Sequence, residues 1–188
     1  MNKYLNTGLK FLVLAFAAIS LLSATYFLTK AKIAEQKLKI KAEKFLEISP
    51  NSNFSAEFFN NPQKIKINNK DALLYKNSED FFIELATSKG YSGEIVVLIG
   101  LKGEIIKGVR ILEHKETAGL GDKIELEKSP WILSFNNQSL KTKNFAIKKD
   151  GGDFDSFSGA TITPRAVVNL LKEVLTNEKA GIQNEKGN

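Results

Sequence analysis

The longest apolar run of the chain lies near its start, where residues 11–28 (FLVLAFAAISLLSATYFL) contain no charged side chain. A run of about 18 apolar residues is just long enough to cross a bilayer as a helix. A cleaved signal peptide is the alternative, but the run is long for such a signal and no small-x-small cleavage site follows it. We therefore expect residues 1–29 to form an uncleaved transmembrane signal anchor.

A helical pattern continues beyond this run, with lysines interrupting an apolar stripe. The stripe predicts a helical stalk over residues 30–48, whose apolar side meets a partner helix or the following domain. A basic amphipathic helix that lies on lipid headgroups is the alternative, and membrane lipid is an expected partner. Residues 49–53 (SPNSN) end the helix. The stripe consists of Ala31, Ala34, Leu38, Ala42, Phe45 and Leu46.

The pattern then changes to short extended segments, which predicts an α+β domain over residues 49–178 and a polar tail over 179–188. The two strongest segments are joined by Lys102-Gly103 as a hairpin, and residues 68–71 (NNKD) read as a turn between two weaker ones. The expected strands are 64–68, 72–75, 81–86, 94–100, 104–112 and 144–148.

A C-terminal helix follows from apolar residues at three- and four-residue steps. Thr163 is expected to cap its start through its hydroxyl, and Pro164 suits the first helical position. A helix start also favours anions, because its free N–H groups and its dipole both attract negative charge. The apolar positions are Val167, Val168, Leu171, Val174 and Leu175.

The residues just before this helix combine features that a phosphoester attachment needs. Gly159 allows the backbone to approach a ligand closely, and Thr161 places a hydroxyl beside the expected anion site. As a bare pattern, a loop before a capped helix is a common structural feature. Whether this loop is a phosphoester site is therefore judged from the spacing of the residues around it.

Composition narrows the possible functions. The net charge of +6 comes from the N-terminal part, and from Phe45 onward the chain has 19 basic and 19 acidic residues. A neutral folded part argues against a nucleic-acid-binding domain. The chain has no cysteine and a single histidine, His114, which excludes disulfides, cysteine-ligated clusters and multi-histidine metal sites. Any redox chemistry must therefore come from an organic cofactor.

Residues 155–161 (DSFSGAT) resemble the flavinylation motif of the FMN-binding domain family, in which the final threonine carries FMN through its phosphate. The resemblance includes Gly151-Gly152 upstream and Ile162-Thr163 downstream, although the usual serine is Pro164 here. It implies covalent FMN on Thr161, with Ser158, Gly159, Ala160 and Thr163 around the phosphate. Asp155, a negative charge near a phosphate site, is expected to serve recognition by the flavin transferase.

A second glycine loop, residues 114–122 (HKETAGLGD), lacks the third glycine of a dinucleotide fingerprint. It resembles the His-x-Glu-Thr-Pro-Gly-Leu-Gly segment of the same family, with Ala118 in place of proline, and Gly90-Tyr91-Ser92-Gly93 also fits. The resemblance implies that Glu116, Thr117 and Leu120 line the flavin ring. We expect His114 to be a surface residue of this loop rather than a proton donor.

Over nearly its whole length the chain resembles the G-subunit family of Rnf electron-transport complexes, which is related to the C subunit of Na⁺-translocating NADH:quinone reductase. The resemblance implies an electron-carrying subunit of a membrane complex that passes electrons between ferredoxin and NAD while moving an ion. It implies no independent turnover, the other subunits and a flavin transferase as partners, and a domain on the extracytoplasmic side. Six lysines after the span against two before it favour the opposite side.

Two other functions stay open. The chain could be a stand-alone membrane-anchored flavoprotein that serves another extracytoplasmic reductase, or a structural subunit whose motif is not modified. Flavin that survives denaturation separates the structural subunit from the other two, and copurifying partners separate the carriers from each other.

Overall fold

The computed structural model describes residues 2–77 and 80–181, which fall into two compact units, Met1–Ala42 and Glu43–Asn188. The first unit is a single helix, the N-terminal part of α1 (Asn2–Ile48). Its large apolar side chains face outward, with Phe16 and Leu22 exposed by 74% and 71%. By length and composition it is the one helix among the described residues that could cross a membrane. The predicted N-terminal membrane helix is therefore confirmed.

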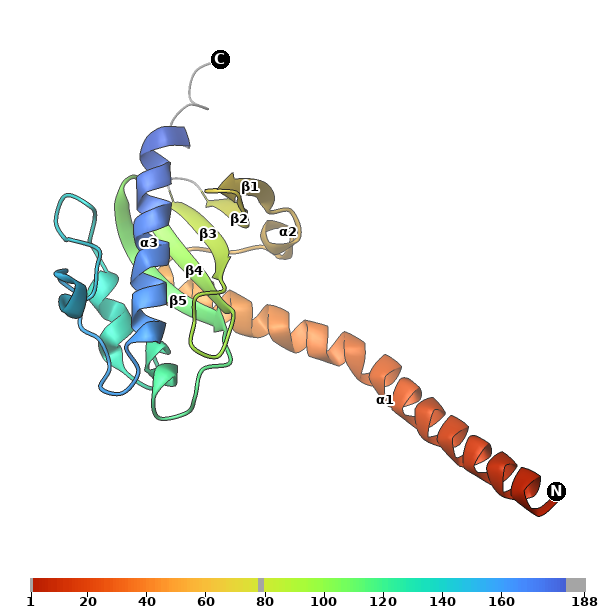
Figure 1. Cartoon of the computed structure of the whole chain (residues 1–188). Helices are drawn as coiled ribbons and strands as arrows, with labels where there is room; N and C mark the ends of the chain where they lie inside the picture. The colour runs from red at the N-terminus through yellow and green to blue at the C-terminus, as the bar shows by residue number, and fades with distance from the viewer. Residues whose placement is uncertain (1, 78–79, 182–188) are drawn as a thin grey trace. The chain divides into compact units, whose positions relative to one another are not determined.

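The second unit is built on a five-stranded antiparallel sheet whose strands lie side by side in chain order (Figure 1). The hairpins form where the sequence predicts them. Asn68 and Asn69 both have positive φ, as a two-residue type I′ turn requires, and Gly103 has a φ of 56°. The strands are β1 (Gln63–Ile67), β2 (Lys70–Asn77), β3 (Asp80–Thr87), β4 (Ile95–Lys102) and β5 (Ile105–Glu113).

Helix α3 (Ile162–Gly181) covers one face of this sheet, as Figure 1 shows. The five apolar positions that predict the helix are all buried, none exposed by more than 3%. They pack against side chains from one face of the strands, among them Ile83, Val97 and Ile99. The predicted α+β fold with a C-terminal helix is thus confirmed. Of the predicted polar tail, residues 179–181 belong to α3, and the rest lies outside the described residues.

The opposite face of the sheet is covered by the last turn of α1 and by the short helix α2 (Ala56–Asn60). Phe45 is fully buried there, and the rings around it have centroids 4.9–5.6 Å from its own. These rings belong to Phe54, Phe58, Phe59, Tyr75 and Phe82. With both faces covered, strand β4 is buried along nearly its whole length.

The end of α1 packs against two paired glycines. Gly100 and Gly108 lie opposite each other on β4 and β5, and Ile48 packs over both. A Cβ atom on Gly100 would lie 2.5 Å from Cγ2 of Ile48, and one on Gly108 would lie 3.2 Å from its Cγ1. The helix ends at Ile48, where the predicted break follows. Of the predicted apolar stripe, Phe45 is buried in this unit, whereas Leu46 remains 42% exposed.

One predicted strand is wrong. Residues 144–148 form no strand, and the chain between β5 and α3 runs through the 3₁₀ turns η1 (Gly121–Ile124), η2 (Pro130–Phe135) and η3 (Lys148–Asp150). The backbone of this segment bonds locally instead, because Lys148 N donates to Phe154 O at 2.7 Å and Phe154 N donates to Ala146 O at 3.2 Å. The turn depends on Gly152, where a Cβ atom would lie 2.0 Å from the carbonyl oxygen of Ala146.

Candidate functional site

A cavity of about 440 Å³ opens at the start of α3, where the two glycine-containing stretches of the sequence meet. The loop after β5 forms one wall and the residues leading into α3 form the other. The loop before β4 and turn η3 complete it. The lining residues are Tyr91, Glu116, Thr117, Leu120, Gly121, Lys149, Gly159, Ala160, Thr161, Ile162 and Thr163.

The segment that enters α3 is held in a tight turn. Ala160 N donates to Phe157 O at 3.2 Å, and Gly159 has a φ of 77°, which favours glycine because it has no Cβ. Arg165 N donates to Thr161 O at 3.3 Å, the first intrahelical bond. Thr161 therefore occupies the N-cap position, so its hydroxyl lies beside the first free N–H groups of the helix.

The predicted cap at Thr163 is wrong, because α3 begins two residues earlier than predicted, at Ile162 and not at Pro164. The hydroxyl of Thr163 is already engaged, since it donates to Glu116 Oε2 at 2.6 Å. Pro164 is consequently the third helical residue and not the first. Its missing N–H leaves no bond unmade, because the N–H groups of the first turn have no partner within the helix.

Glu116 joins three segments of the cavity. It is 8% exposed, and its second oxygen, Oε1, accepts from Ser92 N at 3.0 Å. Its carboxylate leaves room only for glycine nearby, because a Cβ atom on Gly90 or Gly121 would lie 2.7 or 2.8 Å from one of its oxygens. Both carboxylate oxygens are therefore committed to holding the loop before β4 and the start of α3 against the glycine loop.

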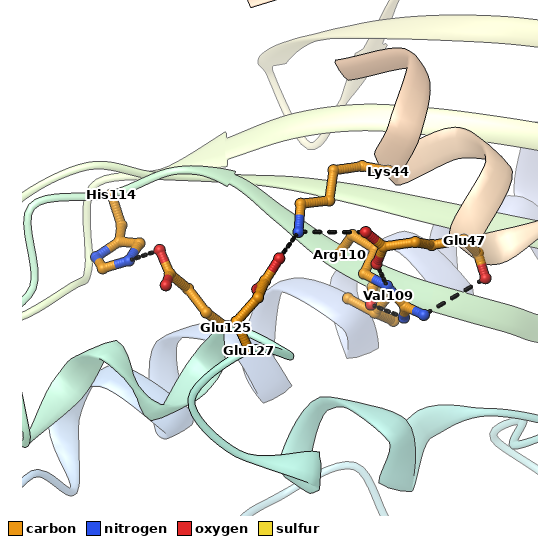
Figure 2. A network of polar contacts seen from close by, with 7 residues as sticks. All are labelled: Lys44, Glu47, Val109, Arg110, His114, Glu125 and Glu127. Atoms are coloured by element: carbon orange, nitrogen blue, oxygen red, sulfur yellow. Dashed lines mark hydrogen bonds and ion pairs between the residues drawn. The ribbon is translucent and has the colours of Figure 1, made fainter. Parts of the chain in front are cut away.

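His114 supports this arrangement through two hydrogen bonds, of which Figure 2 shows the one to Glu125. Its Nδ1 accepts from Glu116 N at 2.9 Å, so the ring proton sits on Nε2, which donates to Glu125 Oε1 at 2.8 Å. In the same view Lys44, from the end of α1, reaches Glu127. The hydrogen bond from Lys44 lowers the pKa of the Glu127 carboxyl below its ordinary value. His114 lies in a loop as predicted, but its side chain is only 11% exposed, so it is a positioning residue within the fold and not the predicted surface residue.

Charged residues of η3 contact the segment before α3 at two points and the first turn of α3 at a third. Lys148 pairs with Asp155 at 2.7 Å, and Lys149 Nζ donates to Thr161 Oγ1 at 2.9 Å. The Asp150 carboxylate accepts two hydrogen bonds from Arg165, at 2.6 and 2.9 Å. These bonds lower the pKa of Asp150. The turn therefore contacts the predicted acceptor hydroxyl directly and the residues on either side of it.

Most of the sequence-predicted site residues come together at this cavity. Thr161, Gly159, Ala160, Thr163, Glu116, Thr117 and Leu120 all line it. Ser158 is exposed and lies outside the described lining, and Asp155 is exposed and paired with Lys148. The lining residues that the sequence did not single out are Tyr91, Gly121, Lys149 and Ile162, and Lys149 had no signal that distinguishes it from the other lysines.

The cavity combines apolar and cationic parts. Tyr91, Leu120 and Ile162 line it with exposures of 70%, 43% and 45%, which is high for large apolar side chains. Lys149 also lines the cavity, and the free N–H groups of the first turn of α3 add donors that favour an anion. A ligand that combines a large apolar ring system with a phosphate has complementary chemistry at both ends.

The chain is similar to known proteins over most of its length. A family model described as FMN-binding domain matches residues 90–176. The chain is 42% identical to the G subunit of the ion-translocating oxidoreductase complex of Pasteurella multocida, with 86% of each chain covered. It is 42% identical to the same subunit of Haemophilus influenzae strain PittEE, covering 92% of this chain and 91% of the relative. It is 36% identical to that of Aliivibrio fischeri strain MJ11, covering 90% and 88%.

Proposed function

Because this chain belongs to the G-subunit family of Rnf-type ion-translocating oxidoreductase complexes, we propose that it carries electrons in such a complex on an FMN bound covalently to Thr161. The family resemblance seen in the sequence is thereby confirmed. FMN supplies one- and two-electron redox chemistry when bound. The protein supplies attachment, orientation and the charges and hydrogen bonds around the ring.

The observation that carries the proposal is the position of Thr161. Its hydroxyl lines the cavity at the N-cap of α3, beside free backbone N–H groups and 2.9 Å from the Lys149 ammonium. A phosphate attached to this oxygen lies where backbone donors and a cation both favour negative charge. Thr163 lacks these features, because its hydroxyl is buried and bonded to Glu116.

Attachment is a phosphoryl-type transfer in which FAD is the flavin donor and a separate flavin transferase is the catalyst. A bond forms between Thr161 Oγ1 and the phosphorus atom next to the ribityl chain of FAD. The phosphoanhydride bond breaks, AMP leaves with the bonding electrons, and the hydroxyl proton passes to a base. The product is a phosphodiester with one negative charge, and the ring system stays unmodified.

The remaining predicted residues take roles consistent with their places. Leu120 and Thr117 line the part of the cavity that suits the flavin ring, and Tyr91 joins them with its exposed aromatic side chain. Glu116 also lines the cavity, and its hydrogen bonds with Thr163 and Ser92 hold that wall in place. Gly159 and Ala160 give the phosphate room by keeping side chains small, and Ser158 offers a hydroxyl at the outer edge of the turn.

Asp155 acts before the flavin is attached to Thr161. Its side chain is 69% exposed, and its charge is offset by Lys148 at 2.7 Å. The backbone oxygen of Asp155 accepts from Trp131 Nε1 at 2.9 Å, which holds the start of the motif against the folded domain. An exposed carboxylate on an anchored turn is suited to contact a second protein, and we assign that contact to the flavin transferase.

We place the domain on the extracytoplasmic side of the membrane. The lysine count around the apolar segment favours the cytoplasm, six after the span against two before it. The stalk lysines are interleaved with Glu35 and Glu43, however, and salt bridges join Glu35 to Lys32 and Lys39. A covalent tether also has its clearest use outside the cytoplasm, where released flavin is lost to the cell.

The decisive experiment is the mass of the intact chain after coexpression with a flavin transferase, compared between wild type and Thr161→Val. Flavin that stays on the denatured wild-type chain excludes an unmodified structural subunit. Copurification of other membrane subunits with the flavinylated chain separates a complex subunit from a stand-alone flavoprotein.

A further inference from the structure

We call the turn at residues 157–161, which carries Thr161, the acceptor turn. The cations around it differ in what they contact. Lys148 and Arg165 each have a carboxylate partner, Asp155 and Asp150 respectively. Lys149 differs, because its partner is the neutral hydroxyl of Thr161 and no carboxylate of the described residues lies within ion-pair distance. Its positive charge is therefore not neutralised, and it lies beside the proposed attachment atom.

The local backbone explains why Lys149 points to this atom. Lys148, Lys149 and Asp150 form one turn of 3₁₀ helix, η3, which Gly151 ends with a φ of 80°. Successive side chains leave such a turn about 120° apart. The flanking ion pairs to Asp155 and Arg165 fix η3 against the acceptor turn on both sides. Lys149, between them, consequently faces Thr161 without needing a carboxylate to hold it there.

We propose that Lys149 is the positioning and charge-compensating residue of flavin attachment, which pairs with the diphosphate of the incoming flavin dinucleotide and then with the Thr161 phosphodiester. This inference rests on the proposed attachment at Thr161. As Oγ1 attacks, negative charge builds on the phosphoryl oxygens and on the departing phosphate. An ammonium in hydrogen-bond contact with the attacking atom stabilises that charge more than it stabilises the neutral starting hydroxyl.

The same residue contributes after attachment. The phosphodiester keeps one negative charge at a place where Asp150 and Asp155 supply two carboxylates to the same turn. Those two are offset by Arg165 and Lys148, so the added charge requires a further cation. Lys149 supplies it without rearrangement of the neighbouring ion pairs.

The test is the rate of FMN transfer to the purified, unmodified full-length chain in detergent, using purified flavin transferase and FAD, followed by intact mass. The variants are Lys149→Gln, Lys149→Arg and the matched control Lys143→Gln, which removes an exposed lysine that belongs to neither η3 nor the cavity lining. We expect Lys149→Gln to slow transfer by about tenfold or more. Lys149→Arg and Lys143→Gln should stay within about threefold of wild type, because a cation remains beside Thr161 in both. Melting temperatures should not change.

A second measurement excludes a merely structural role. Added salt should slow transfer to the wild-type chain more steeply than transfer to Lys149→Gln, because the variant lacks the charge that salt screens. Equal rates for wild type and Lys149→Gln, or equal salt dependence, would overturn the role of Lys149 while attachment at Thr161 stood. If the wild-type chain gains no flavin at Thr161, the proposed function fails, and this inference fails with it.

Discussion

The hydroxyl of Thr163 donates a hydrogen bond of 2.6 Å to the buried carboxylate of Glu116, which joins the start of α3 to the glycine loop after β5. The two stretches that carry the flavin resemblance are thus connected through one oxygen atom. This contact separates the two threonines of the motif by function. Thr163 holds the site together, whereas Thr161 remains available for chemistry.

Thr163→Val should therefore destabilise the domain. The substitution keeps the shape of the side chain but leaves Glu116 Oε2 buried without its donor, which costs about 1–3 kcal/mol. Thr161→Val should destabilise the domain less than Thr163→Val, because the Thr161 hydroxyl accepts from an exposed lysine and its loss leaves no buried group without a partner. Denaturant titration of the full-length chain in detergent, followed by fluorescence of the single tryptophan, Trp131, measures both. Equal stability of the two variants would contradict this division of roles.

The contact between Ile48 and Gly100 gives a prediction for the second, smaller core. Gly100→Ala should cost about 1–3 kcal/mol, because its new Cβ atom would lie 2.5 Å from Cγ2 of Ile48. Ile48→Ala alone should cost about 2–5 kcal/mol through the lost packing. The double variant should be more stable than the sum of the two losses predicts, because Ile48→Ala removes the clashing atom. Strict additivity of the changes in the free energy of unfolding would show that Ile48 does not pack against Gly100.

Regular elements were predictable from local pattern, and the reason is physical. Five strands and α3 bury apolar side chains at the period of their own geometry, so their pattern is visible in consecutive residues. The segment at 144–148 has the same local pattern, but its backbone bonds to the turn that follows it around Gly152 instead of joining the sheet, and the period of its side chains does not encode that choice. The position of the helix start was missed for a similar reason, since a distant carboxylate, Glu116, engages Thr163.

The residues of the candidate site also differ in whether the local sequence identifies them. The glycines and hydroxyls could be identified because their spacing follows a motif within one stretch. Lys149 could not, since its role depends on η3 being held beside the acceptor turn by the Asp150–Arg165 and Lys148–Asp155 pairs. Tyr91 lies between these cases, because its loop fits the family pattern but only the structure brings it to the cavity.

Asp155→Asn tests the proposed contact with the transferase. The exposed pair with Lys148 contributes little to folding, so the free energy of unfolding should change by less than about 1 kcal/mol. FMN transfer at limiting transferase should slow, because the carboxylate that contacts the enzyme is gone. Lys148→Gln is the matched control, since it breaks the same pair and leaves the carboxylate in place. Normal flavin loading of Asp155→Asn would show that the transferase does not use this residue.

Reporter fusions after Asn188 test the side of the membrane. We expect a fused alkaline phosphatase to be active, because that enzyme matures only after export, and a reporter that fluoresces only in the cytoplasm to stay dark. Moving two stalk lysines to the N-terminal flank leaves four lysines on each side of the span and so removes the charge bias, and it should leave this result unchanged or strengthen it. A bright cytoplasmic reporter together with an inactive phosphatase would place the domain inside the cell and remove the reason for a covalent tether.

Peptide mapping of the denatured chain by mass spectrometry identifies the residue that carries the flavin. The full-length wild-type chain, coexpressed with a flavin transferase, should gain the mass of FMN less one water, with the added mass on the peptide that contains Thr161. Thr163→Val, whose cavity is weakened but whose acceptor is intact, should still gain it, and Thr161→Val should not. Flavin that remains on denatured Thr161→Val, or added mass that maps to Thr163 or Ser158, would show that Thr161 is not the attachment residue.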